Sequence, residues 1–426
     1  DAAMRFCLIT TFFPPQGFGG DAIYVQRLAR ALVRMGHHVE VIHCQDSYEA
    51  LAPAGSRAKP VKGHRGTLQG VDGVIVHRLH SRLGPLSPLA TYLTGRPLFK
   101  RRRIGRILEA GKFDVIHYHN ISLVGGPALL ALGNAVKLYT MHEHWLLCPT
   151  HVLFRFNRAL CTRRTCILCQ LAHRRPIQLW RHSDLLKRSL QHVDAFLALT
   201  RFTRDLHQAR YPELPWRHLP PFAVPSLANP SGSAVQMLPE KPFFLYVGRL
   251  ERLKGVQTLI PLFQQQEANA APADLVIVGQ GSLAEDLKRQ VQRMGSRIHL
   301  IGHLAAEELP AIYARAIAVL VPTLTYEVFN QVIVEAFAQA TPVIARDLGP
   351  LPEIVREAGG GLTYRDETEL LTHLRHLAKD QSERERLGRS GQEAIATLWS
   401  ERSVLARYLA IIEELRSQRS LPAPLP

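Results

Sequence analysis

The sequence has few acidic residues, few aromatic residues and no long apolar run. Of its 426 residues, 52 are Lys or Arg but only 36 are Asp or Glu, which gives a formal net charge of +16. No apolar run approaches the roughly 18 residues of a membrane span, and the apolar segment 6–13 is too short for a signal peptide. We therefore expect a cytoplasmic protein with a negatively charged partner, such as nucleic acid, an anionic membrane or a phosphorylated substrate.

Cysteine is also scarce, and four of the six cysteines fall in one short segment, at Cys148, Cys161, Cys166 and Cys169. Few disulfides are expected in a cytoplasmic chain. Four thiolates at such spacing can hold a structural zinc ion or an iron–sulfur cluster, although only Cys166 and Cys169 have the usual two-residue separation. Free thiols or a redox disulfide are the alternatives. A site closed by four thiolates would leave no open position for catalysis.

Apolar runs, glycine loops and amphipathic segments alternate along both halves of the chain. Residues 5–12 predict a buried strand, residues 17–20 a glycine loop, and the following residues a helix that ends near Met35. A proline-rich stretch at 213–240 predicts a linker. The expected fold is α/β, with two Rossmann-like doubly wound domains that face a central cleft. Their expected limits are 4–212, with a cysteine-rich insert at 145–175, and 241–398, followed by a helix at 399–418 that packs back on the first domain.

Two carboxylates mark the junction between a strand and a helix in the second half. The apolar run 316–321 predicts a buried strand, Glu327 lies on the loop after it, and Glu335 lies about a turn and a half into the next helix. Ligands of open parallel sheets bind outside the carboxyl ends of the strands. Both acids could therefore face one cleft, although a helix-end charge and a solvated helix face would explain them equally well.

The residues around these acids resemble a known family. Glu327 and Glu335 form an E-x7-E pattern, which the strand Thr341-Pro342-Val343-Ile344-Ala345 and the segment Gly349-Pro350-Leu351-Pro352-Glu353-Ile354-Val355 follow. This stretch of sequence resembles the retaining GT-B glycosyltransferases of family 4, the glycosyl transferases group 1 type. The resemblance covers nearly the whole chain and is most specific at 243–357.

The resemblance implies a reaction and a set of residues. It implies retaining, metal-independent transfer of a sugar from a nucleotide-diphosphate sugar, with UDP or GDP as the favoured nucleotide, to a saccharide, lipid-linked or small-molecule acceptor. Glu327 would hold sugar hydroxyls and steady the oxocarbenium-like centre, Glu335 would hold the ribose, and His142 would orient the sugar or the acceptor. The other implied residues are Gly19, Gly20, Arg249 and Lys254 for the donor diphosphate, Phe329 and Asn330 beside the donor sugar, and His119 as a further pocket residue.

Two positions depart from the family pattern, because Asn330 and Ala340 stand where glycine is common. Asparagine tolerates positive φ better than most residues, so we expect the loop at Asn330 to be kept. Alanine is costlier than glycine in a left-handed helix cap, so the helix end at Ala340 is expected to differ. The chain has no evident Asp-x-Asp metal motif, which agrees with a metal-independent reaction.

A basic segment at 98–108 predicts an amphipathic helix. Lys100, Arg101, Arg102, Arg103 and Arg106 flank an apolar face in this segment. Such a helix can lie on an anionic membrane, here the inner face of the cell membrane, or be an ordinary solvated surface helix. A nucleic-acid-binding protein with a zinc knuckle, or an epimerase or phosphorylase on the same fold, are the alternative functions. Nucleic acid is the less favoured partner, because it leaves the glycine loops and paired glutamates unexplained.

Overall fold

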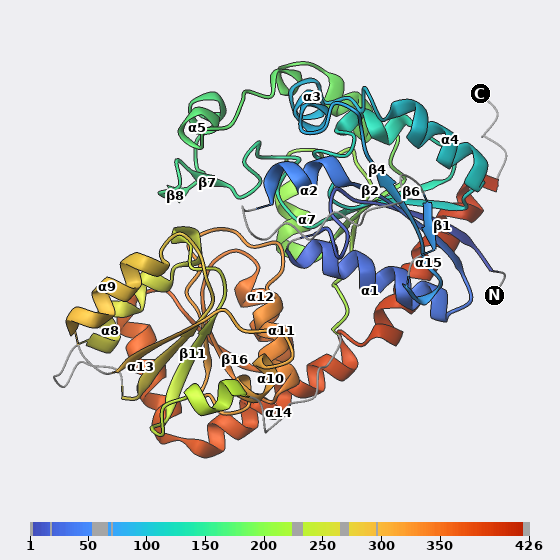
Figure 1. Cartoon of the computed structure of the whole chain (residues 1–426). Helices are drawn as coiled ribbons and strands as arrows, with labels where there is room; N and C mark the ends of the chain where they lie inside the picture. Colours follow the sequence, from blue (N-terminus) through green and yellow to red (C-terminus); the bar gives the residue numbers. More distant parts are fainter. Residues whose placement is uncertain are drawn as a thin grey trace.

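The computed structural model has two sheet-centred lobes (Figure 1). It describes residues 3–17, 19–52, 67–69, 71–223, 233–264, 272–294 and 297–420. Part of the expected linker, residues 224–232, lies outside the described residues. No helix in the described ranges combines the length and the apolar character needed to cross a bilayer.

The first lobe is built on a sheet of strand order β10-β9-β6-β5-β1-β2-β4-β3, parallel except for β3. Its strands are β1 (Arg5–Ile9), β2 (His38–Cys44), β3 (Thr67–Gln69), β4 (Ile75–Leu79), β5 (Val115–Tyr118), β6 (Val136–Met141), β9 (Ala195–Ala198) and β10 (Trp216–His218). The helices of this lobe are α1 (Gly20–Arg34), α2 (Gln45–Leu51), α3 (Leu86–Thr94), α4 (Arg101–Gly111), α5 (Cys166–Ala172), α6 (Leu185–Leu190) and α7 (Arg201–Gln208). Most residues of the central strands are buried because helices cover both faces of the sheet.

The second lobe repeats this plan with six parallel strands in the order β13-β12-β11-β14-β15-β16. They are β11 (Phe243–Val247), β12 (Asp274–Val278), β13 (Ile298–Gly302), β14 (Val319–Val321), β15 (Val343–Arg346) and β16 (Gly361–Tyr364). The helices are α8 (Ile260–Gln264), α9 (Ala284–Met294), α10 (Leu309–Tyr313), α11 (Gln331–Ala338), α12 (Leu351–Ala358), α13 (Glu367–Lys379) and α14 (Gln381–Thr397). The α/β GT-B architecture expected from the sequence is confirmed.

The last helix, α15 (Glu401–Ser420), leaves the second lobe and runs along the first (Figure 1). Its Tyr408 and Ile412 are buried in the core that α1 shares with the first sheet. Trp399, just before it, stacks on Phe337 in the core of the second lobe. The chain therefore ends by packing against both lobes.

Candidate functional site

An ion pair joins the two loops that follow β11 and β14. Lys254 Nζ lies 2.7 Å from Glu327 Oε1, and the Thr323 hydroxyl donates to the same oxygen at 2.9 Å. The side chains of Lys254 and Glu327 are only 23% and 12% exposed. The paired charges neutralise each other where the carboxyl ends of the strands meet, which is where an open parallel sheet binds its ligand.

Gly255 lets the lysine loop approach the glutamate loop. Its φ is +78°, and a Cβ at this position would lie 2.1 Å from the carbonyl oxygen of Pro322. The amide of Leu324 also donates to the carbonyl of Leu253 at 2.8 Å. Because both contacts are between backbones, they fix how closely the two loops approach each other.

Arg249, the second expected diphosphate residue, lies on the loop directly after β11. Its side chain is 62% exposed and pairs with Glu251 at 3.0 Å. An exposed ion pair contributes little to stability. The guanidinium can therefore exchange Glu251 for a phosphate at small cost.

The first turns of α1 face the second lobe. Gly19 adopts a φ of 94° before the helix, and a Cβ on Gly20 would lie 3.9 Å from Gln331 Cγ, at the start of α11. One turn later, the ring of Tyr24 lies 5.1 Å from that of His142. The helix N-terminus, with its free amides and partial positive charge, therefore adjoins the segment that carries Glu327 and Glu335.

Glu335 lines a pocket between the lobes. The Tyr313 hydroxyl donates to Glu335 Oε2 at 2.8 Å. Desolvation by the surrounding protein raises the pKa of Glu335, while Tyr313 and Arg27 act in the opposite direction. The pocket has a volume of about 320 Å³, and residues on α1, α10 and α11, including Arg27, Pro310 and Gln331, line it.

His142 and His119 form a neutral pair at the carboxyl ends of β6 and β5. His119 Nδ1 and His142 Nε2 share a hydrogen bond of 3.0 Å. Burial lowers the pKa of His142 to about 4 and that of His119 well below its usual value. His117 lies behind them and bonds to Tyr408 of α15 at 2.9 Å. One imidazole must therefore donate and the other accept, so His119 controls which nitrogen His142 presents to the cleft.

Asp21 belongs to this cleft but has no recognisable motif in the sequence. It lies in the first turn of α1, and Asn120 Nδ2 donates to its Oδ2 at 3.2 Å. Burial and the neighbouring Glu143 raise the pKa of Asp21 to about 6. In the sequence, its position directly after Gly19-Gly20 was the only feature that could have indicated a place for Asp21 in the cleft.

The backbone conformation of Asn330 corrects one expectation from the sequence, and that of Ala340 refines another. The idea that Asn330 keeps the loop by tolerating positive φ is wrong, because its φ is −114°. Asn330 instead caps α11, accepting from the amide of Ile333. Ala340 does adopt the left-handed conformation, with φ 54°, so the chain keeps this turn without glycine. Phe329 packs edge-on against Trp399.

The first lobe holds the glutamate loop from the other side. Thr325 Oγ1 donates to the carbonyl of Val152 in the cysteine-rich insert. His144 Nε2 donates to the carbonyl of Tyr326 at 3.1 Å. The insert therefore contacts the loop that carries Glu327.

The four clustered cysteines are free thiols in one region. Cys148, Cys166 and Cys169 each help to raise the pKa of Cys161 after burial, and the amide of Phe156 donates to Cys169 Sγ at 3.4 Å. The compact group of potential metal ligands within the described ranges is elsewhere, at Asp46, Glu49 and His80. The sulfurs are thus near one another but do not form a tetrahedral cage.

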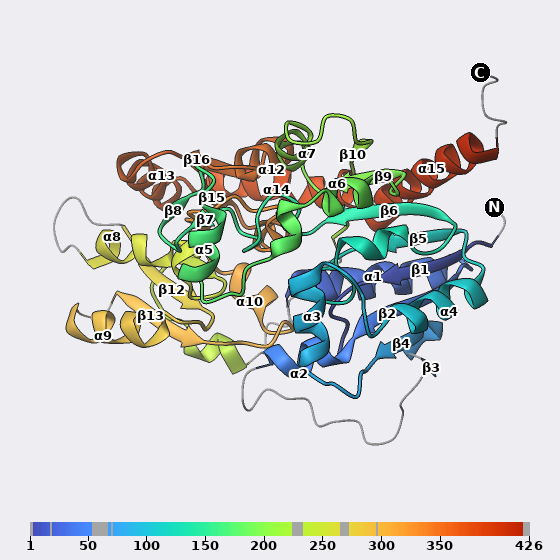
Figure 2. The same cartoon turned by 90° about the horizontal axis from the view of Figure 1, so that it is seen from above.

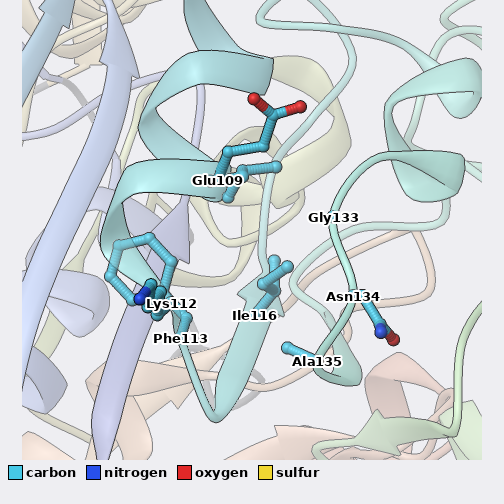
Figure 3. A pocket seen from close by; sticks show the side chains of 8 residues that line it. Glu109, Lys112, Phe113, Ile116, Gly133, Asn134 and Ala135 are labelled. Carbon is cyan, nitrogen blue, oxygen red and sulfur yellow. The ribbon is translucent and has the colours of Figure 1, made fainter.

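A cavity larger than the one at Glu335 lies at the amino ends of strands in the first sheet (Figure 3). It has a volume of about 380 Å³ and is lined by residues at the end of α4 and before β5 and β6, among them Glu109, Lys112 and Asn134. It adjoins the amino ends of these strands, whereas the candidate site lies at their carboxyl ends. We therefore do not assign it to the active site.

Comparisons with known proteins agree with this arrangement. The family model described as "Glycosyltransferase Family 4" matches residues 18–222, and the model "Glycosyl transferases group 1" matches residues 234–394. The chain belongs to the family 4, group 1 glycosyltransferases. It is a glycosyltransferase enzyme.

Individual relatives span almost the whole length of this glycosyltransferase. The MMP alpha-(1->4)-mannosyltransferase of Mycolicibacterium hassiacum is 25% identical, over 93% of this chain and 95% of the relative. The structure of sucrose-phosphate synthase from Thermosynechococcus elongatus has a TM-score of 0.73 at 21% identity and covers 97% of this chain and 100% of that chain. The structure of Anabaena HepE in complex with UDP has a TM-score of 0.61 at 17% identity, with 97% and 100% coverage. These matches do not favour the nucleic-acid-binding, epimerase or phosphorylase alternatives.

Proposed function

We propose that this glycosyltransferase transfers a sugar with retention of anomeric configuration, from a UDP- or GDP-sugar held by the second lobe to an acceptor held by the first. The observation that carries the proposal is the Lys254–Glu327 pair, whose glutamate lies on a loop of the second lobe that contacts the first lobe through Thr325 and Tyr326. A cation, a carboxylate and free helix amides are the groups that a leaving diphosphate and a cationic sugar centre require. UDP in the Anabaena complex agrees with such a donor.

In the proposed mechanism, negative charge grows on the diphosphate as the bond to the sugar breaks. Lys254, Arg249 and the amides after Gly19 would stabilise this charge. Glu327, once Lys254 turns to the phosphate, would hold sugar hydroxyls and face the oxocarbenium-like centre. Glu335 would bind the ribose hydroxyls. No step needs a metal ion.

His142 is proposed to orient the sugar or the acceptor, with His119 behind it. Because the pKa of His142 is lowered to about 4, its imidazole is neutral near pH 7 and can act through a hydrogen bond. Phe329 and Asn330 would act through their backbone, since one side chain packs on Trp399 and the other caps α11. Saccharide, lipid-linked and small-molecule acceptors all fit an acceptor domain with an open cleft.

The product's anomeric configuration tests this proposal. Purified protein is incubated with α-linked UDP-glucose, UDP-galactose and GDP-mannose, with water as the acceptor, and the free sugar that is first released is observed by proton NMR before mutarotation. We expect an α product from one donor, and a loss of turnover in Glu327→Gln but not in Glu385→Gln, an exposed control on α14. A β product, or equal turnover in both variants, would contradict the proposal.

We also propose that the insert 145–175 is stapled by a structural metal ion that draws the four cysteines together. The residues fit in ligand type and number, but their sulfurs would have to move closer than they lie here. Metal analysis of native protein and of Cys166→Ser, with Cys7→Ser as the control, tests this. One zinc per chain that only Cys166→Ser loses is expected, and a metal-free, fully folded native protein would contradict it.

The proposed domain limits are 4–212 for the acceptor domain, 213–240 for the linker and 241–398 for the donor domain, followed by the helix at 399–418.

A further inference from the structure

Helix α3 turns its apolar side outward. Leu86, Leu89 and Leu93 form one stripe along the helix and are 60%, 41% and 37% exposed. The inward side carries Ser87 and Thr91, which are 1% and 2% exposed. Surface helices normally show the reverse pattern, so this orientation needs an explanation.

A buried lysine fixes the orientation of α3. Lys100, 3% exposed, donates from Nζ to Ser87 Oγ at 2.5 Å and lies 3.9 Å from Asp46 Oδ2. The indole of Trp180 also donates to the carbonyl of Tyr92 at 2.9 Å. Turning the leucines inward would remove the hydroxyl partner of a buried charge, which is costly. The exposed leucine stripe is therefore a stable feature of the fold.

The apolar surface extends beyond α3. Leu98 and Phe99, between α3 and α4, are 45% and 55% exposed. Leu179, which follows α5 and belongs to a short turn that packs on α3, is 70% exposed. Helices α3, α4 and α5 lie along the same upper side of the first lobe in Figure 1, and this side faces the viewer in Figure 2.

Positive charge follows this surface along the chain, on α4. Arg101, Arg102 and Arg106 on α4 are exposed. Within the part of the chain that the structure describes, their guanidinium groups form no ion pair. These arginines and the six apolar residues Leu86, Leu89, Leu93, Leu98, Phe99 and Leu179 are called the α3–α4 face below.

We propose that the α3–α4 face docks on the surface of an anionic lipid membrane. Its leucines and phenylalanine would enter the boundary between headgroups and acyl chains, while the arginines contact anionic headgroups. A second copy of the chain is a poorer occupant, because a two-fold contact through this face would bring the unpaired arginines of both copies together. The net charge of +16 favours the same anionic surface.

Docking in this way goes beyond the proposed transfer reaction and does not depend on it. It would also hold the cysteine-rich insert at the membrane, because α5 lies on the same side of the lobe. Through Val152, the insert contacts the loop that carries Glu327. Docking would thus bring the insert, which contacts the Glu327 loop, near acceptors carried by a lipid.

Vesicle binding tests the proposal. The full chain is sedimented with vesicles of phosphatidylcholine alone and with vesicles containing 30% phosphatidylglycerol, at low salt and at 0.5 M NaCl. We expect binding to the anionic vesicles only, weakened at least tenfold by salt. Leu86→Ser with Leu89→Ser, and Arg101→Gln with Arg102→Gln and Arg106→Gln, should each reduce binding at least tenfold.

Two matched variants control for general surface changes. Met35→Ser with Leu398→Ser removes exposed apolar side chains elsewhere, and Arg315→Gln with Arg389→Gln and Arg402→Gln removes the same charge elsewhere. Both should bind as the native chain does. Native protein that ignores anionic vesicles, or controls that lose as much binding as the α3–α4 variants, would overturn the proposal. So would a dimer in vesicle-free solution that Leu86→Ser with Leu89→Ser makes monomeric.

Discussion

Two single substitutions can distinguish the role of Lys254 from that of Glu327. Lys254→Met removes the cation and keeps a long flexible chain, whereas Glu327→Gln removes the carboxylate charge and keeps its size. In the structure the two charges are 2.7 Å apart and mostly buried. Only Lys254→Met should weaken nucleotide binding, because Lys254 is proposed to bind the diphosphate while Glu327 competes for Lys254.

The expected magnitudes follow from the contacts. A hydrogen bond to a charged group contributes about 1.5–3 kcal/mol, so Lys254→Met should weaken nucleoside-diphosphate binding by roughly 10- to 150-fold. Glu327→Gln frees Lys254, so diphosphate affinity should stay the same or rise. Transfer should nevertheless fall by about 100-fold or more in Glu327→Gln, because a group that stabilises the charged transition state is lost.

Titration calorimetry with the nucleoside diphosphate, together with donor turnover, gives both quantities. Thermal unfolding of each variant checks that the lobe is intact, and the double variant completes a cycle that isolates the pair. Equal losses of diphosphate affinity in the two single variants would refute the assignment of separate roles.

Three further predictions concern stability. Ala340→Gly should raise the free energy of unfolding by about 0.5–1 kcal/mol, because Ala340 holds a left-handed φ of 54°; an unchanged urea midpoint would contradict this. Gly255→Ala should lower the free energy of unfolding by about 2 kcal/mol or more, through positive φ and the contact with the Pro322 carbonyl, and weaken diphosphate binding; a native melting temperature would count against it. Asp21 has a pKa raised from 3.8 to about 6, so the folded state holds the proton more tightly than the unfolded chain and the native protein should lose stability as pH rises from 4 to 6. At about 1.4 kcal/mol per pKa unit the full loss is roughly 3 kcal/mol, of which about 2 kcal/mol falls between pH 4.5 and 7.5. Asp21→Asn should lack this loss in urea titrations at these two pH values; an identical pH dependence would refute the cause.

The strands were the most predictable part of the fold. The predicted strand 5–12 forms β1 over Arg5–Ile9, because apolar runs between polar turns are typical of buried parallel strands. The run 316–321 forms a strand only at Val319–Val321. Ala316 completes the turn after α10, and the amide of Ile317 already donates to the carbonyl of Phe243 at the start of β11. Helix α3 was not predicted from the sequence. Its leucines point outward because its polar side, which carries Ser87, covers the buried Lys100.

The site was predictable as a set of positions but not as a set of contacts. Glycine loops and paired glutamates can be recognised as motifs in the sequence. The Lys254–Glu327 ion pair cannot, because it joins residues 73 positions apart. Asn330 shows the limit of a propensity argument. Its tolerance of positive φ was considered, but its ability to cap a helix determined its conformation.

The most direct test of the account is nucleotide binding by the donor site. Thermal unfolding is followed with UDP, GDP, ADP, CMP and no nucleotide, for native protein and Glu335→Gln. A nucleotide at 100 times its dissociation constant stabilises the folded state by about 2.7 kcal/mol. The account predicts a clear rise in melting temperature with one diphosphate, reduced in the variant. A well-folded protein that responds to none of them would contradict it.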